Sequence, residues 1–185
     1  MKCWTPLYSV WGPMADIRGF LARRRVAIGG VAVLITLIFA TPTWPRWAIG
    51  FAVALVGEGL RVWAAGHLEK NREVTRSGPY RYMRHPLYNG SSIIAIGVML
   101  AANNFFVSLL TVVYIGTTVP AAISSEEAHL RNTFGDLYDR YQRDEAPGVE
   151  RPFSLARAVR NKEYRAVLGV LAGFGLLALR VRFLL

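Results

Sequence analysis

Cysteine is nearly absent from this 185-residue sequence, in which Cys3 is the only one. An intrachain disulfide is therefore impossible, and a cysteine-rich metal site is excluded. His67 and His129 have no metal-ligand spacing with a carboxylate or with each other, so we predict no metal site and expect both side chains to be solvated or interfacial. The sequence also lacks a phosphate-binding loop, a Gly-x-Gly-x-x-Gly turn and an ordered Ser-His-Asp set, which removes the common soluble nucleotide-binding and hydrolase signatures.

Hydrophobic residues make up 53% of the chain, its mean hydropathy is +0.29, and they come in blocks. The blocks cover residues 26–40, 47–66, 87–102, 105–123 and 166–185. They predict an all-α integral membrane bundle of about five transmembrane helices, built as a single domain over residues 1–185. The last block contains Arg180 and Arg182, which can snorkel to the far interface, and it either crosses the membrane or lies along it.

The basic residues follow the membrane topology. Five lie in the first 25 residues, five in residues 67–85 and eight in residues 124–165. The turns at 41–45 and 103–104 begin the loops on the opposite side of the membrane, and Arg46 is the one basic residue in those loops. By the positive-inside rule, the N-terminus and these basic segments lie on the cytoplasmic side. The net charge of +10 is therefore attributed to basic residues that contact the lipid head groups of the bilayer, and we predict no nucleic-acid partner.

Residues 77–90, which we call the motif, place polar, aromatic and cationic groups between two apolar blocks. Pro86 suits the first position of a helix, where its missing N–H costs nothing. Taken alone, His85 would be an interfacial histidine or a helix N-cap. Together with Tyr80, Arg84 and Tyr88 it offers stacking faces and donors at a helix start, which suits an anion or a nucleoside.

Two further groups of charged residues are candidates for the same site. Residues 124–152 predict a cytosolic amphipathic segment, capped by Ser124 or Ser125, interrupted near Gly135 and ended by Pro147-Gly148. Glu126 and Glu127 then fall in its first turn, where the helix dipole favours anions. Glu58 and Arg61, one turn apart inside a predicted span, form either a structural pair or part of a cofactor cavity.

Three stretches resemble signatures of one family. Residues 78–88, Gly-Pro-Tyr-Arg-Tyr-Met-Arg-His-Pro-Leu-Tyr, the preceding residues 60–64 and the downstream residues 126–141 follow one another with compatible spacing. The chain is similar to the isoprenylcysteine carboxyl methyltransferases, integral membrane enzymes related to phospholipid N-methyltransferases. The resemblance covers residues 57–152 and implies an all-helical bundle that binds S-adenosylmethionine in a cytosolic pocket.

The resemblance also implies roles for single residues. It assigns cofactor contacts to the motif and to a downstream carboxylate, with Arg84 as a further contact or a residue that stabilises the loop. The cofactor contacts implied are Thr75, Tyr80, Arg84, His85, Pro86, Leu87, Tyr88 and Glu126. No catalytic residue is assigned, because methyl transfer from a sulfonium depends mainly on alignment and on the exclusion of water.

One position departs from the family pattern. Members that act on prenylcysteine carboxylates carry an arginine one turn before the glutamate, where this chain has Ala122. The expected substrate is therefore a lipophilic small molecule or lipidated acceptor of unknown identity. Two alternatives remain open: a sterol-type membrane reductase that uses NADPH, and a non-enzymatic membrane protein that retains the fold.

Overall fold

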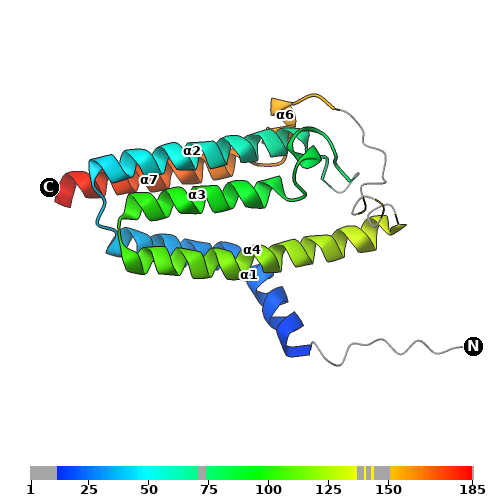
Figure 1. The fold of residues 1–185 in the computed structure, drawn as a ribbon, viewed down its shortest axis with the longest axis horizontal. Helices are drawn as coiled ribbons and strands as arrows, with labels where there is room; N and C mark the ends of the chain where they lie inside the picture. The colour runs from blue at the N-terminus through cyan, green and yellow to red at the C-terminus, as the bar shows by residue number, and fades with distance from the viewer. Residues whose placement is uncertain (1–11, 71–73, 137–139, 141–142, 144–150, 185) are drawn as a thin grey trace, which may run out of the picture.

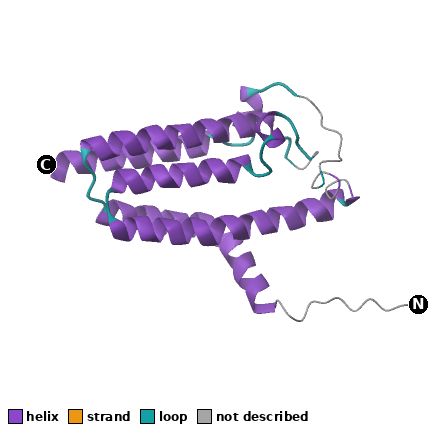
Figure 2. Cartoon of the chain, in the orientation of Figure 1, coloured by secondary structure: helices purple, strands orange, loops and turns teal. Residues whose placement is uncertain are grey.

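The computed structural model describes residues 12–70, 74–136, 140, 143 and 151–184, and every regular element among them is helical (Figure 2). The all-α prediction is therefore confirmed for the described part of the chain. In chain order the elements are α1 (Gly12–Phe39), α2 (Trp44–His67), the 3-10 helix η1 (Gly78–Arg81), α3 (Pro86–Ala102), α4 (Phe105–Phe134), α6 (Leu155–Arg160) and α7 (Tyr164–Leu184).

The helices form two layers (Figure 1). Helices α2, α3 and α7 make one layer, in which α2 contacts both of the others. Helices α1 and α4 pack on each other and make the second layer, while the N-terminal turns of α1 point away from the bundle (Figure 1). The space between the layers holds the candidate site.

Glycine allows α2 and α3 to pack backbone against backbone. A Cβ atom on Gly50 would overlap the carbonyl oxygen of Gly97, and one on Gly57 would lie 2.7 Å from the carbonyl oxygen of Gly90. Small residues at such crossings are typical of membrane helices, because apolar lipid gives little hydrophobic drive for association and close packing must supply it. The pair of helices therefore forms a rigid wall for the site.

The two predicted turns meet at one end of the bundle. The backbone N–H of Thr41 donates to the carbonyl oxygen of Ala102 at 2.9 Å, and Asn103 ends α3 in the left-handed conformation with φ 48°. The Asn104 side chain then accepts from the N–H of Val107 at 3.1 Å and caps α4. Asparagine suits both positions, since it tolerates positive φ and caps helix starts.

In the part of the chain that the structure describes, three helices, α2, α4 and α7, are long and apolar enough to cross a membrane. Two shorter apolar helical stretches, Ala27–Phe39 and Pro86–Ala102, accompany them. The chain is thus a multi-pass membrane protein. Within α7, Arg180 donates from Nε to the carbonyl oxygen of Ala40 at 2.7 Å, so it caps the end of α1 at this end of the bundle.

One sequence-based boundary was wrong. Helix α4 runs without a break through residues 105–134, so Ser124 and Ser125 are interior residues and cap nothing. The polar segment continues the apolar span, with Pro120 inside the helix, and Gly135, with φ 53°, ends α4 at the position where the sequence predicted an interruption. The first helix begins at Gly12, and its apolar part, Ala27–Phe39, coincides with the apolar block predicted over residues 26–40. The predicted end at Pro147-Gly148 lies outside the described residues.

Candidate functional site

A cavity of about 1040 Å³ lies between the two helical layers. Its volume is at the upper end of the range of roughly 300–1,000 Å³ typical of small-molecule sites. One end is polar and aromatic, with walls from the motif and the polar part of α4. The other end is an apolar arm between α1, α3, α4 and α7, lined by residues such as Leu37, Val98, Ile115, Val170 and Phe174.

The motif folds onto the last turn of α2. Gly78 has φ +58°, and a Cβ atom there would lie 2.5 Å from the imidazole of His67, so only glycine fits without displacement. The imidazole Nδ1 of His67 lies 3.1 Å from the hydroxyl of Ser77. The prediction of a solvated or interfacial His67 was wrong, because the motif covers this residue and leaves it 6% exposed.

The start of α3 is as the sequence predicts. Pro86 is its first residue and His85 occupies the N-cap position, yet no side chain caps this helix start. Instead, Nε2 of His85 lies 3.1 Å from a carboxylate oxygen of Glu127 on α4. The pair joins the two layers at the polar end, and sequence reasoning did not identify Glu127 as the partner.

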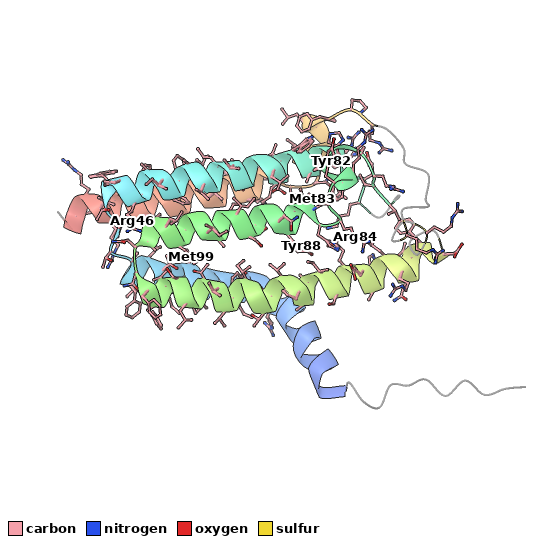
Figure 3. All side chains as sticks on the ribbon, viewed as in Figure 1. Arg46, Tyr82, Met83, Arg84, Tyr88 and Met99 are labelled. Atoms are coloured by element: carbon pink, nitrogen blue, oxygen red, sulfur yellow. The ribbon has the colours of Figure 1, made fainter. Side chains whose placement is uncertain are left out.

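Most of the predicted cofactor contacts line this one cavity. They are Thr75, Tyr80, Arg84, His85, Leu87, Tyr88 and Glu126. Pro86 is the exception: it is buried at the start of α3 and is absent from the cavity wall. Arg84 and Tyr88 lie on the side of the motif that faces α4, while Arg46 and Met99 mark the opposite end of the bundle (Figure 3).

Glu58 and Arg61 form the predicted structural pair, and both also line the cavity. Nε of Arg61 is 3.8 Å from Glu58, and its NH2 nitrogen is 2.7 Å from a carboxylate oxygen of Glu163, just before α7. The same guanidinium donates to the hydroxyl of Ser91 and to the carbonyl oxygen of Leu87 on α3. Arg61 therefore ties three elements together beneath the motif.

A carboxylate just after α2 holds the segment that carries α6. Glu69 pairs with Arg157 at 2.8 Å, Arg160 at 3.1 Å and Arg151 at 3.2 Å. Desolvation alone would raise the pKa of Glu69, but the hydrogen bond from Arg157 and the charges of Arg160, Arg157 and Arg151 outweigh it and lower that pKa. Since Glu69 also lines the cavity, these contacts fix the rim of its polar end.

The same segment caps the end of α2. The guanidinium of Arg157 donates to the carbonyl oxygen of Gly66 at 2.5 Å. The amide of Asn161 donates to the carbonyl oxygens of Ala65 and Leu68, both at 2.9 Å. Carbonyls at a helix end otherwise lack partners. Sequence reasoning missed these residues, and only the clustering of Arg157 and Arg160 after the polar segment hinted at an acidic partner.

The fold and cavity define a class: a multi-pass helical membrane protein with a polar pocket that continues into an apolar arm between its helices. Comparison with known proteins is consistent with this class. The family described as phospholipid methyltransferase matches residues 25–137, more than half of the chain. The chain therefore belongs to the phospholipid methyltransferase family, and the predicted relation to isoprenylcysteine methyltransferases is confirmed.

The curated relatives carry different names. A protein-S-isoprenylcysteine O-methyltransferase of Schizosaccharomyces pombe is 31% identical over 126 residues, which are 63% of this chain and 52% of the relative, so the chain spans about half its length. The nickel-cobalt-cadmium resistance protein NccN of Alcaligenes xylosoxydans xylosoxydans is 27% identical over 71% of this chain and 68% of its own. The cobalt-zinc-cadmium resistance protein CzcN of Cupriavidus metallidurans is 28% identical over 69% and 64%. No solved structure matches the chain significantly.

Proposed function

We propose that this protein transfers a methyl group from S-adenosylmethionine to a lipophilic acceptor at the membrane. The observation that carries the proposal is the continuity of the cavity. One continuous space of about 1040 Å³ joins a polar, aromatic end to an apolar arm. A polar cofactor and an apolar acceptor can therefore meet without leaving the protein.

The residues at the polar end fit this cofactor. The start of α3 has no side-chain cap, so the positive end of its dipole and the nearby Arg84 suit the carboxylate of the methionine part. Among the described residues Glu126 has no ion-pair partner, and its carboxylate suits an ammonium group or ribose hydroxyls. The rings of Tyr80 and Tyr88 suit a sulfonium charge or a purine face.

The chain's own residues act by positioning. S-adenosylmethionine supplies an electrophilic methyl group when it is bound. The His85–Glu127 contact fixes the imidazole at the cavity wall, and Arg61 holds the start of α3 against α2. Alignment of reacting groups and exclusion of water are the contributions that an in-line displacement needs most from a protein.

The apolar arm supports a lipophilic acceptor. It lies between α1, α3, α4 and α7, of which α4 and α7 are, like α2, long enough to span a bilayer. We also propose that α1 and α3 cross or enter the membrane with them, giving about five membrane helices, and that the motif end faces the cytoplasm. Ala122 lines the cavity in place of the family's arginine, so a prenylcysteine carboxylate is not the acceptor that we propose.

Isothermal titration calorimetry of the purified protein in lipid nanodiscs tests the cofactor. S-adenosylmethionine should bind, NADPH should not, and Glu126→Ala and His85→Ala should each weaken binding by about tenfold or more, as expected for losing a charged hydrogen bond. Asp136→Ala is the matched control, because Asp136 is an exposed carboxylate outside the cavity wall. Transfer of a radiolabelled methyl group to a total lipid extract then identifies the acceptor class. NADPH binding alone would overturn the proposal in favour of a reductase.

A second candidate function follows from the names of two relatives. NccN and CzcN are called metal-resistance proteins, and each aligns over a larger share of this chain than the Schizosaccharomyces pombe enzyme does. A non-enzymatic role in metal resistance is therefore the alternative. Binding of neither cofactor, together with a metal-sensitive phenotype on deletion of the gene, would favour it.

A further inference from the structure

A second hollow lies at the end of the bundle opposite the motif, and among the described residues it shares none of its wall with the candidate site. Its volume is about 300 Å³, and its wall comes from the first turn of α2, the last two turns of α3, the turn at 103–104 and the first turn of α4. Arg46 and Met99, which both line it, mark that end of the bundle in Figure 3. Helix α3 is 17 residues long, or roughly 25 Å at ~1.5 Å per residue, and separates the hollow from the motif. A ligand bound here would therefore be independent of the cofactor end.

Arg46 gives this hollow a positive charge that the protein does not compensate. Within the part of the chain that the structure describes, its guanidinium makes no hydrogen bond and no ion pair, and the residue is exposed. No acidic residue lines the hollow among those described. Arg46 also belongs to the first turn of α2, where the helix dipole is positive and no side chain caps the helix. Both charges have the same sign, so the hollow suits an anion.

Two asparagines add neutral donors to the same wall. Asn104 caps α4 with its side-chain oxygen, which accepts from the N–H of Val107 at 3.1 Å, and its amide nitrogen donates to no other described residue. The amide nitrogen of Asn103 donates to the carbonyl oxygen of Thr41 at 3.2 Å and keeps a second hydrogen. A guanidinium fork with amide donors nearby matches the oxygens of a phosphate group.

The rest of the wall is apolar and partly exposed. Ile96 is 50% exposed and Phe105 is 83% exposed, and Met99 and Leu100 line the hollow with them. These residues belong to the apolar helix α3 and to the start of α4, a helix long enough to cross a membrane. A charged group next to exposed apolar side chains at the end of such helices lies where lipid head groups meet acyl chains.

We propose that this hollow binds one phospholipid of net negative charge, with its phosphate at Arg46 and its acyl chains along the exposed apolar side chains of α3 and α4. A zwitterionic head group would bring an ammonium charge, and no described carboxylate in the hollow can pair with it. Phosphatidylglycerol carries hydroxyl groups in place of the ammonium, so its only charge is the negative one that Arg46 attracts. The lipid is a bound structural partner, and the proposed methyl transfer does not act on it at this site.

Photo-crosslinking in nanodiscs tests this inference. The protein is placed in phosphatidylcholine nanodiscs that contain increasing fractions of phosphatidylglycerol with a diazirine in its acyl chain, and labelling of residues 96–108 is measured by peptide mass spectrometry. In the wild type the labelling should saturate at a low fraction of the probe, whereas labelling in proportion to the fraction would show random contact and refute the site. Arg46→Gln should raise the half-saturating fraction about tenfold or more, as expected for losing a charged hydrogen bond.

Arg182→Gln is the matched control. It removes the same charge from an exposed arginine in the last turn of α7, at the same end of the bundle but outside the wall of the hollow (Figure 1). Saturation should be unchanged in this variant, and an equal shift in both variants would mean that net charge alone attracts the lipid. Ser108→Leu fills the hollow and keeps Arg46, so it should also abolish saturation. If it does not, Arg46 acts as a simple surface charge and the inference is wrong.

Two further probes identify the ligand chemistry. Phosphatidylcholine with the same diazirine chain should label residues 96–108 without saturation, and equal saturation by both lipids would remove the requirement for net negative charge. Glycerol 3-phosphate at millimolar concentration should leave the labelling by phosphatidylglycerol unchanged, whereas displacement would show that the hollow takes a soluble phosphate and that the lipid assignment is wrong. The comparison of the two lipids uses the wild type, so it decides the inference even if a variant fails to fold.

Discussion

Filling the apolar arm from α7 should weaken the binding of long-chain acceptors and leave the cofactor alone. Gly173 lines the cavity, and a Cβ atom built on it meets nothing within 4 Å. Gly173→Leu therefore adds its side chain to open space and not to a packed contact. Glycine is also a poor helix former, so the helix itself should gain stability.

The expected effect follows from the volume. The substitution adds four carbon atoms. If each occupies ~30 Å³, the volume of a water molecule in the liquid, together they fill roughly 120 Å³ and displace about four methylenes of a bound chain. The whole cavity measures about 1040 Å³, so most of it stays open. At ~0.8 kcal/mol for each buried methylene, the loss is about 3 kcal/mol, or roughly a hundredfold in affinity for a chain that fills the arm.

The assay is the dissociation constant of a series of straight-chain alcohols of increasing length, measured by thermal stabilisation in nanodiscs. Affinity in the wild type should rise with each methylene, whereas in Gly173→Leu the rise should stop once the chain reaches the added side chain. Gly175→Leu is the matched control, since Gly175 lies on the same helix, meets nothing within 4 Å and does not line the cavity. Equal chain-length dependence in Gly173→Leu and the wild type would refute the assignment of the arm.

Three further predictions concern the polar end and its rim. Ala122→Arg adds a guanidinium to the cavity wall and should tighten the binding of decanoate relative to decanol by about tenfold, measured by thermal stabilisation in nanodiscs. Glu127→Ala removes the partner of His85 and should weaken S-adenosylmethionine by about tenfold in calorimetry, with Glu127→Gln less affected. Because the pKa of Glu69 is lowered in the folded protein, its contribution is fully present above the ordinary carboxyl pKa and is lost as the pH falls through the lowered value. The protection factors of the α6 amides, which compare the intrinsic with the observed hydrogen-exchange rate at the same pH, should therefore fall over that acidic range, and in Glu69→Gln they should be low at every pH.

Local signals in the sequence were sufficient for the ends of several helices. Asn103 and Asn104 lie at a turn because their side chains tolerate left-handed backbone and cap helices, and Pro86 starts α3 because its ring presets the helical φ. Gly135 ends α4 for the same kind of reason, with φ 53°. Each of these outcomes depends on one or two residues, so no knowledge of distant packing was needed.

The predicted helix start at Ser124 or Ser125 was wrong because the composition becomes polar after residue 123, whereas the helical backbone continues to Phe134. Ser124 and Ser125 have cap chemistry, but a cap requires the backbone to leave the helix before it, and α4 does not. The partner of His85 was equally out of reach. Adjacent carboxylates point to different sides of a helix, and the position of α4 about its axis decides that Glu127 meets His85 while Glu126 lines the cavity.

The unbroken helix α4 links the polar end of the cavity to its apolar arm. Thr118, Ala122 and Glu126 are spaced by one turn each and all line the cavity. They mark a path of roughly 12 Å at ~1.5 Å per residue, from the apolar arm to the carboxylate of the polar end. Had the helix broken at Ser124, a flexible joint would separate the two parts, whereas a single helix fixes the distance between them. The methyl transfer that we propose requires two bound molecules to be aligned, and the single helix α4 fixes the distance between the two parts of the cavity that would hold them.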